Sequence, residues 1–407
     1  MNTKSSTFAT ASLWPAFGLG LSVAVGNGLA RFAYALILPA MHQAMAWNYA
    51  QAGWLNTANA LGYLAGAASG YLLLRYRSPT WLFSVGLYLT VLSLPATALS
   101  ADLVWLTAAR LLSGIGAAWA FSCGGALVAV RYRHFPDLSG TAMGLYFAGA
   151  GIGIALSGLA VDPLLAFWGV AAWPQAWLLL GLLAAVLSVW PLLEARRPVD
   201  VAPSASRRAL SLSGLWTPLL GYLLFAAGYI VYMTFILAWM RNQGWSLLFG
   251  LSFWLILGSG VAVSPFVWRV ALNNWPPALT QSASCFATLI GASIPILDGG
   301  GASLLCSAAA FGLGMFIVPS SVAVLVRQRM PSDLWAKGIT FFTVVFALGQ
   351  AIGPVAAGAI ADMGTLNDSL SFGAALLLVA ALLPLLGLAS KGVPGHRLGE
   401  GLNEESE

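Results

Sequence analysis

Long apolar runs separated by short polar joints make up almost the whole chain. Twelve of the runs reach about 20 residues or more, the length that an α-helix needs to cross a hydrocarbon core roughly 30 Å thick. The pattern therefore predicts an all-α integral membrane protein. The predicted spans are 13–40, 50–73, 80–100, 103–129, 138–161, 172–193, 214–240, 247–268, 278–297, 301–326, 338–361 and 370–390.

Composition supports this class. Hydrophobic residues make up 59% of the 407 residues and charged residues only 8%, a balance that excludes a soluble domain of this length. The first run continues unbroken from Leu13 to Leu38 and lacks a small-residue cleavage site after a short apolar core. We therefore predict a retained first helix rather than a signal peptide.

The basic residues predict the orientation. Of 18 Lys and Arg, fifteen fall in joints on the side of the N-terminus, and Arg241 is the only one in a joint on the other side. Because cytoplasmic loops are enriched in Lys and Arg, we expect both termini to be cytoplasmic and the number of spans to be even. This bias also accounts for the net charge of +5, so no nucleic-acid partner is needed.

The chain divides into two similar halves. The longest internal polar joint, 194–213, is rich in Pro, Ser and Arg and separates a six-helix bundle at 1–193 from a second at 214–390, with a cytoplasmic tail at 391–407. A glycine motif recurs at an offset of 200 residues. It reads Gly149, Ile152, Gly153, Gly158, Asp162 and then Gly349, Ile352, Gly353, Gly358, Asp362. Two six-helix repeats are the expected signature of an alternating-access transporter.

At this point the residues resemble the major facilitator superfamily (MFS) of secondary transporters over essentially the whole chain. The fourth span carries Arg110 followed by Gly114 and Gly116, which resembles the superfamily's fourth-helix motif. The glycines of the fifth and eleventh spans, the latter with Pro354, look like the motif often seen in efflux members. The segments 28–34 and 228–235 resemble the YbfB-type branch, so the resemblance implies the MFS fold of two pseudo-symmetric six-helix bundles.

One departure concerns gating. The superfamily's loop after the second span usually offers Gly-x3-Asp-Arg, whereas here Gly70 leads to Leu74 and Arg75. The usual aspartate of the cytoplasmic gate is therefore absent, and the standard charge-relay account of gating does not carry over.

Two arginines lie deep inside predicted spans. At about 1.5 Å per residue, Arg31 is roughly 12 Å and Arg110 roughly 10 Å from the outer ends of their helices, so they share a depth. Asn27, Arg31 and Tyr34 follow the spacing i, i+4, i+7, and Arg110 pairs with Ser113 at i, i+3, which predicts two polar faces lining one cavity.

No acidic residue of the sequence is predicted at that depth, so an incoming anion is one partner for these guanidiniums. We therefore expect an anionic or carboxylate-bearing substrate. The alternative is that each arginine is a structural bracket, hydrogen-bonded to carbonyls of neighbouring helices.

The second half offers a neutral, aromatic face. Phe225, Tyr229 and Tyr232 recur at helical spacing on the seventh span, and Gln350 lies in the eleventh. The tyrosines and Gln350 complete the predicted substrate-binding set, although helix packing explains such a stripe as well. Asn56 and Asn59 are further buried polar candidates, for which hydrogen bonding between helices is an equal explanation.

Small residues let helices approach closely and slide, so we assign the glycine motifs to packing and gating rather than to substrate contact. Proline within a span can kink a helix. The predicted packing and gating residues are Gly114, Gly149, Gly153, Gly158, Gly349, Gly353, Pro354 and Gly358.

The sequence leaves the coupling open. Each of the 13 acidic residues is predicted in a joint or at a helix end, so a proton would be carried by the substrate, by Asp162 or Asp362 at a mouth, or not at all. A uniporter or exchanger remains an alternative.

Other classes of protein are less well supported. The three cysteines lie singly in separate spans, and no metal-ligand spacing occurs, so neither an enzyme nor a cofactor or metal is predicted. A non-transporting membrane sensor is a second alternative. We predict a monomeric inner-membrane transporter that alternates access to a small organic anion. Efflux of amphipathic or aromatic compounds is the main alternative.

Overall fold

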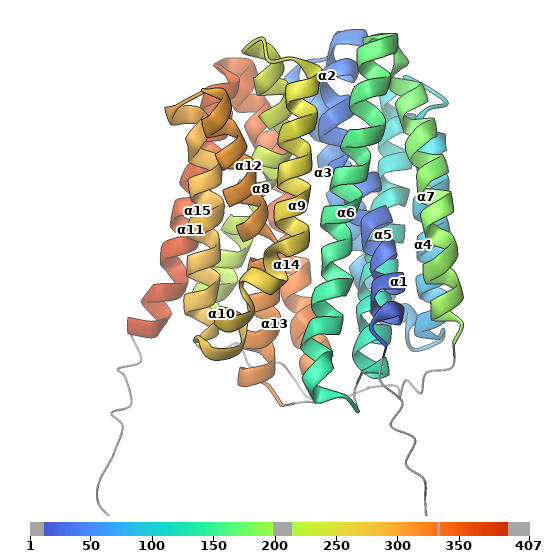
Figure 1. Ribbon diagram of the computed structural model, residues 1–407, viewed down its shortest axis with the longest axis vertical. Helices are drawn as coiled ribbons and strands as arrows, with labels where there is room; N and C mark the ends of the chain where they lie inside the picture. Colours follow the sequence, from blue (N-terminus) through green and yellow to red (C-terminus); the bar gives the residue numbers. More distant parts are fainter. Residues whose placement is uncertain (1–11, 133, 198–213, 332–333, 390–407) are drawn as a thin grey trace, which may run out of the picture.

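The computed structural model describes residues 12–132, 134–197, 214–331 and 334–389, and within these ranges the chain is a bundle of long helices without strands. The helices stand side by side and run nearly parallel to the long axis of the molecule (Figure 1). The all-α membrane fold expected from the sequence is confirmed. The predicted tail at 391–407 and most of the predicted linker, 198–213, lie outside the described residues.

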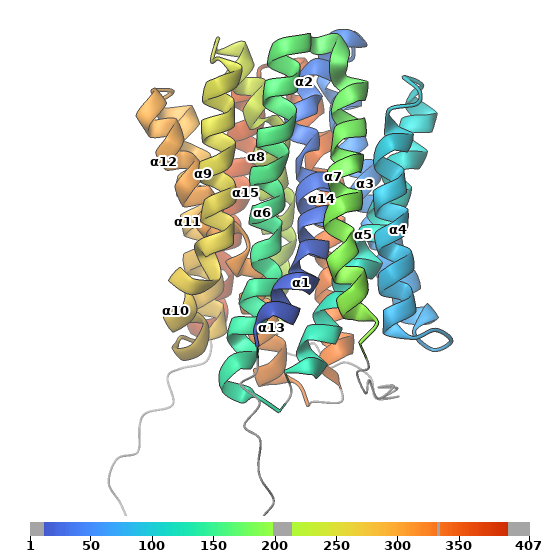
Figure 2. The same cartoon turned by 45° about the vertical axis from the view of Figure 1, so that its right-hand side comes forward.

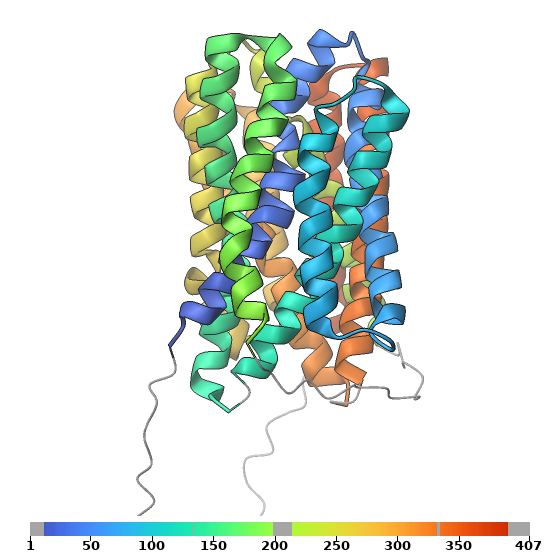
Figure 3. The same cartoon turned by 90° about the vertical axis from the view of Figure 1, so that its right-hand side faces the viewer.

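The helices up to Ala195 form the first group. They are α1 (Trp14–Val23), a π-helix η1 (Ala24–Phe32), α2 (Tyr34–Ala44), α3 (Tyr49–Leu73), α4 (Pro79–Thr97), α5 (Leu103–Arg131), α6 (Pro136–Trp168), a short 3-10 turn η2 (Val170–Ala172) and α7 (Trp173–Ala195). In Figure 3 these helices, coloured blue to green, lie mostly in front of the second group.

The second group follows the long joint. It consists of α8 (Trp216–Asn242), α9 (Leu247–Val267), α10 (Arg269–Asn274), α11 (Pro277–Leu297), α12 (Gly301–Met315), α13 (Ile317–Arg329), α14 (Trp335–Met363) and α15 (Leu366–Ala389). The tenth predicted span is divided at Phe316. Pro319 has no N–H to donate to the carbonyl four residues earlier, at Met315, which explains the break.

Eleven helical stretches in the described ranges are long and apolar enough to cross a membrane. The second predicted span, α3, is equally long but is too polar to meet that criterion, because it carries Gln51, Asn56, Thr57 and Asn59. These last three side chains are buried against other helices, so α3 does not present them to lipid. A polar helix is tolerated at this position for that reason.

Two spans form the centre of the bundle. In the stretch α1–η1–α2 the most apolar window is 100% buried and in α8 it is 89% buried, whereas the corresponding windows of the other nine stretches are at most 56% buried. Figure 2 shows the dark blue first span passing between its neighbours. The side chains of η1 and α8 are therefore interior groups, and Arg31 and Tyr229 lie on them.

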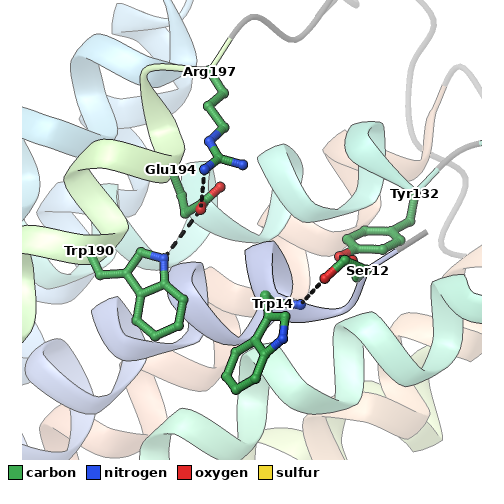
Figure 4. Close-up of polar contacts among 6 residues, drawn as sticks. All are labelled: Ser12, Trp14, Tyr132, Trp190, Glu194 and Arg197. Carbon is green, nitrogen blue, oxygen red and sulfur yellow. Dashed lines mark hydrogen bonds and ion pairs between the residues drawn. The ribbon is translucent and has the colours of Figure 1, made fainter. Parts of the chain in front are cut away.

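The bundle has two ends, which we name by residues. The Trp14 end holds the first described helix start and the last helix end, and the Tyr49 end holds the turns at 45–48 and 243–246. At the Trp14 end, the Tyr132 hydroxyl donates to the Ser12 carbonyl over 2.7 Å, and Glu194 accepts from Trp190 and pairs with Arg197 (Figure 4). Glu194 belongs to α7, which extends two residues beyond the predicted span.

The two groups meet mainly along two helix pairs, α3 with α14 and α6 with α9, and α2 also packs against α8. Figures 1 and 2 both show α6 beside α9. At the Tyr49 end, the Asp362 carboxylate of α14 accepts hydrogen bonds from the backbone N–H groups of Tyr49 and Ala50, at 2.8 and 2.9 Å. Farther along α3, the Thr57 hydroxyl donates to the Ala351 carbonyl over 2.7 Å. The groups are therefore joined by specific bonds at this end.

The repeated glycine motif has the same packing in both groups. A Cβ on Gly149 would lie 2.0 Å from the carbonyl oxygen of Gly20 on α1, and one on Gly349 would lie 2.3 Å from that of Leu223 on α8. These contacts lie within each group. Gly158 and Gly358 face the opposite group, where a Cβ would meet Trp254 of α9 at 2.9 Å and the Tyr49 carbonyl of α3 at 2.5 Å, respectively.

The remaining glycines of that predicted set also pack closely. A Cβ would lie 2.2 Å from the Ala24 carbonyl oxygen at Gly153, 2.5 Å from that of Ala227 at Gly353 and 2.1 Å from that of Asn59 at Gly114. Pro354 lies within α14, and its carbonyl faces Gly53 of α3. All of these positions are at helix contacts, which is where small residues are needed. Their role in gating stays a prediction.

One expectation about the acidic residues was wrong. We predicted Asp162 in a joint just beyond a span, but α6 continues to Trp168 and ends at Gly169, whose φ of +78° suits glycine. Asp162 is therefore inside a helix and only 2% exposed.

Candidate functional site

Arg31 lies on a π-helical turn in the middle of the first span. The wider turn is seen in the hydrogen bond from Ala33 N–H to the Gly28 carbonyl five residues earlier, at 2.9 Å. Gly28 allows the backbone of α6 to approach, since a Cβ there would lie 2.3 Å from the Cα of Gly153. This π-helical stretch of nine residues interrupts the α-helix, and π-helical insertions are frequent at functional sites.

The Arg31 side chain reaches across to the second group. Its Nη2 donates to the Gln350 Oε1 of α14 over 2.6 Å, and the Gln350 amide donates in turn to the Tyr229 hydroxyl of α8. The guanidinium carbon lies 5.4 Å from the centre of the Tyr63 ring of α3. The structure thus brings together three of the predicted site residues, Arg31, Gln350 and Tyr229, from three helices.

The charge of Arg31 has no acidic counterpart among the described contacts. The side chain is 4% exposed, its Nε has no hydrogen-bond partner among the described residues, and the contacts above are all with neutral groups. A buried cation of this kind costs several kcal/mol unless it is paired. The site therefore contains a positive charge without an acidic partner and, at Nε, a buried N–H group without an acceptor among the described residues.

Arg110 occupies a separate setting within the first group. Its Nη1 donates to the Ala30 carbonyl over 2.5 Å, and the guanidinium carbon lies 5.4 and 5.2 Å from the centres of the Tyr34 and Trp177 rings. The two rings stack on each other, with centres 6.4 Å apart and planes inclined by 20°, so the guanidinium lies beside the stacked pair and contacts both rings. Arg110 is 0% exposed and, through Ala30, holds the backbone directly before Arg31.

A row of aromatic rings begins at Tyr229. Its ring stacks on Phe225 at 5.1 Å and on Phe346 of α14 at 5.6 Å, and Phe346 stacks on Tyr222 at 4.8 Å. The row is formed by α8 and α14 alone. Tyr229 also accepts the Gln350 hydrogen bond, and Gln350 bonds to Arg31. Gln350 therefore connects the aromatic row to the Arg31 guanidinium.

The residues predicted to form one polar face of the first span contact different parts of the protein. The Tyr34 hydroxyl donates to the Ala52 carbonyl over 2.7 Å and its ring stacks on Trp177, so it belongs with Arg110 rather than with the Arg31–Gln350 bond. The i, i+4, i+7 spacing assumed an α-helix, and the π-helical turn rotates the residues that come after it. Asn27, on η1, is 7% exposed, and Ser113 is buried with no hydrogen-bond partner for its hydroxyl among the described residues.

The predicted tyrosine stripe is also divided. The Tyr232 hydroxyl shares a 2.6 Å hydrogen bond with Ser307 of α12, and its ring stacks on Phe311 at 4.0 Å. Ser307 in turn donates to the Gly291 carbonyl over 2.6 Å. Tyr232 thus faces α12, whereas Tyr229 faces α14. Its partners indicate packing between helices of the second group.

Several residues of the site were not predicted. Tyr63, Trp177 and Phe346 surround the two arginines and the aromatic row, yet each falls in an ordinary apolar run. The only signal in the sequence is the spacing of Asn56 and Tyr63 at i, i+7, which puts both on one face of α3. Asn56 itself donates to the Thr234 hydroxyl of α8 over 2.6 Å, and Asn59 donates to the Arg110 carbonyl over 3.2 Å.

Among the described side chains, no three His, Cys, Asp or Glu come close enough together to hold a metal ion. The groups assembled around Arg31 are instead a cation, an amide, phenol hydroxyls and aromatic rings. Such a set can bind a small organic molecule through charge, hydrogen bonds and stacking.

Comparison with known proteins gives concordant results. The family profile described as "Uncharacterised MFS-type transporter YbfB" matches residues 22–385. The 3-(3-hydroxy-phenyl)propionate transporter of Escherichia coli (strain K12) is 28% identical over 387 residues, which cover 90% of this chain and 91% of that protein.

Two solved structures have a similar fold. A mutant of the nucleoside transporter NupG aligns with a TM-score of 0.69 at 13% identity, covering 92% of this chain and 99% of that one. A bacterial homologue of the human lysosomal transporter Spinster, in an inward-facing and unoccupied conformation, aligns with a TM-score of 0.68 at 15% identity, covering 93% and 97%. At these identities the likeness concerns the fold alone.

The family profile spans the chain from the first predicted helix to the last, and the fold agrees with it. The predicted membership of the major facilitator superfamily, in its YbfB-type branch, is thereby confirmed. The chain belongs to the YbfB-type family of MFS transporters.

Proposed function

We propose that this protein is a secondary transporter that carries a small aromatic carboxylate across the cytoplasmic membrane by alternating access. The observation that carries the proposal is the Arg31 guanidinium, which is buried where the two helix groups meet and whose partners among the described residues are all neutral. The name of the Escherichia coli relative supports an aromatic carboxylate as the solute.

The carboxylate is expected to replace Gln350 on Arg31. A carboxylate forms two parallel hydrogen bonds with a guanidinium, and these charge-assisted bonds are roughly twice as strong as bonds between neutral groups. The exchange would release the Gln350 amide, which would keep Tyr229 as its partner or bind the second carboxylate oxygen. Because Arg31 and Gln350 belong to different helix groups, substrate binding changes the bond that joins them.

The aromatic part of the substrate would then lie along Tyr229, Phe225 and Phe346. Offset-stacked rings contribute about 0.5–1.5 kcal/mol per pair beyond the burial of apolar surface. Gln350 bonds both to Arg31 and to Tyr229, the first residue of the aromatic row. This arrangement matches a molecule whose carboxylate is a few bonds away from an aromatic ring.

The described conformation is closed at the Tyr49 end, where Asp362 and Thr57 join the two groups. With the basic joints at the Trp14 end, the positive-inside rule assigns that end to the cytoplasm and the Tyr49 end to the outside. We therefore interpret the structure as closed to the outside. The proposal also includes an inner-membrane location, cytoplasmic termini and a monomeric transport unit.

Binding to purified protein in detergent tests the substrate class. The probes are 3-phenylpropionate and the neutral isostere 3-phenylpropionamide, measured by thermal stabilisation. We expect the acid to stabilise the wild type and the amide not to do so. Arg31→Gln should lose about 10-fold to 100-fold in affinity for the acid, in line with a hydrogen bond to a charged group. The exposed Arg269→Gln is the matched control and should bind normally.

A different result would support the second candidate, efflux of amphipathic or aromatic compounds. The stacked rings of Phe225, Tyr229 and Phe346 favour it. It predicts that the amide binds as well as the acid, that binding survives Arg31→Gln, and that Tyr229→Ala abolishes it. Counterflow of the bound probe in proteoliposomes then separates a transporter from a membrane sensor, since a sensor binds its ligand without moving it.

A further inference from the structure

Asp162 is an acidic side chain that the substrate site does not use. It lies near the Tyr49 end of α6, where it is 2% exposed, and neither carboxylate oxygen accepts a hydrogen bond from a described residue. Its one charged partner among the described residues is Arg241 of α8, in the other helix group, whose Nη2 lies 3.8 Å from Oδ1. A buried carboxylate without hydrogen bonds depends on that single cation for its charged form.

Arg241 is held in place by its own helix group. Its Nη1 donates to the Trp245 carbonyl over 3.0 Å, and Gly250 makes room for the guanidinium, since a Cβ there would lie 2.7 Å from Nη2. The ion pair therefore spans the boundary between α6 and α8, with the cation fixed on one side and the carboxylate on the other. Its loss removes a bond between the groups without disturbing either one.

The repeated motif supplies an internal comparison. Asp362 occupies the position equivalent to Asp162, but both of its oxygens accept backbone N–H groups at the start of α3, and the side chain is exposed. Asp362 therefore has two hydrogen-bond donors at a helix N-terminus, which Asp162 lacks among the described residues. Of the two equivalent acids, Asp162 alone combines burial with an absence of hydrogen bonds from described residues, so a proton can replace its partner at the smallest cost.

Arg241 is the one charged group whose electrostatic interaction with the Asp162 carboxylate is resolved among the described residues. The helices packed against α6 also carry ionisable groups, except α9, which has none. The other groups on the neighbouring elements are Arg31 on η1, Tyr34 and His42 on α2, Arg110, Cys123 and Arg131 on α5, and Glu194 on α7.

We propose that Asp162 is a proton-binding site whose protonation breaks the bond to Arg241 and opens the Tyr49 end. A proton from the solution at that end adds to a carboxylate oxygen and gives the neutral acid, which no longer attracts the Arg241 guanidinium. Deprotonation restores the ion pair and the closed arrangement. The inference concerns coupling and goes beyond the proposed substrate.

Distances between spin labels test the proposal without any substrate. Labels on Val170→Cys and Leu248→Cys mark the two groups at the Tyr49 end, in a chain with Cys123→Ala, Cys285→Ala and Cys306→Ser. Both labelling positions are exposed, at 39% and 69%. Double electron–electron resonance in lipid nanodiscs is recorded at about pH 5 and about pH 8, on either side of the range expected for a perturbed carboxyl group.

We expect the population with a long distance to grow several-fold at the lower pH. Asp162→Asn should show the long distance at both pH values, and Asp162→Glu should restore the pH response. Arg241→Gln removes the same ion pair from the other side and should match Asp162→Asn, which covers the case of an unstable Asp162 variant.

The control is Asp298→Asn. Asp298 is an exposed carboxyl at the same end, where hydrogen bonds from Ser303 and the Gly300 N–H lower its pKa. This variant should keep the wild-type response. A wild-type distribution that does not change with pH would overturn the proposal, as would a response that survives in both Asp162→Asn and Arg241→Gln. Neither result would bear on the binding of 3-phenylpropionate.

Discussion

The Arg110 guanidinium donates a hydrogen bond over 2.5 Å to the carbonyl of Ala30, the residue directly before Arg31. This bond links Arg110 to the backbone next to Arg31, the other arginine that the sequence places at this depth, but the two side chains make different contacts. Arg31 reaches the second helix group, whereas Arg110 stays within the first, beside the Tyr34 and Trp177 rings, and bonds to the π-helical backbone. We therefore interpret Arg110 as a positioning residue.

Replacing Arg110 by Gln is predicted to lower stability more than it lowers substrate affinity. The variant loses a charge-assisted hydrogen bond, worth about 1.5–3 kcal/mol, and the contact with two rings. Thermal unfolding should show the destabilisation, while affinity for 3-phenylpropionate should fall less than in Arg31→Gln. The opposite pattern, a stable variant without binding, would make Arg110 a direct ligand of the carboxylate.

Replacing Gln350 by Glu is predicted to abolish anion binding while the protein stays folded. The new carboxylate would lie where Gln350 Oε1 now accepts from Arg31, and it would neutralise the guanidinium permanently. Thermal unfolding should show unchanged or higher stability, and titration with 3-phenylpropionate should show no stabilisation. Gln350→Met, which removes the amide without adding charge, is the matched control and should retain binding. Loss of binding in both variants would mean that the Gln350 amide itself is needed.

The two tyrosines of α8 are predicted to behave differently. Tyr229→Phe removes the hydroxyl that Gln350 bonds and should change the affinity for 3-phenylpropionate several-fold. Tyr232→Phe removes a hydrogen bond to Ser307, so it should cost about 1 kcal/mol of stability and leave affinity within about twofold. Parallel titrations and melting curves distinguish them. An equal loss of affinity in both variants would support the prediction from the spacing, in which both tyrosines bind the substrate.

Much of the fold can be predicted from the sequence because the signals are strong. Apolar runs of membrane length, the basic joints and the glycine motif at a fixed offset predict the helices and how they pack. The same signals fail where a helix departs from regular geometry. The π-helical turn at Ala24–Phe32 alters the direction of Tyr34 relative to Arg31, and no pattern of apolar residues marks it.

The candidate site was predicted only in part. Arg31, Gln350 and Tyr229 stand out as polar groups in apolar runs, so sequence reasoning finds them. Tyr63, Trp177 and Phe346 do not, because an aromatic residue in a membrane span looks the same whether it faces lipid, a helix or a guanidinium. Asp162 was misplaced because its span was ended at the first acidic residue, whereas the helix continues and Arg241 pairs with that acid.

Replacing Gly358 by Ala is predicted to separate the two groups at the Tyr49 end. The added Cβ would lie 2.5 Å from the Tyr49 carbonyl and 2.8 Å from the Ala50 Cα, and these backbone atoms cannot move without displacing α3. The label pair at positions 170 and 248 should show a larger long-distance population at about pH 8 than the unsubstituted chain does. Gly140→Ala adds the same methyl group to α6 at a position where no atom of the described residues lies within 4 Å, so it should have no effect. If both variants gave the unsubstituted distribution, the close approach of Gly358 to α3 would not control closure, and the Asp362 bonds to Tyr49 and Ala50 would be the contacts to remove next.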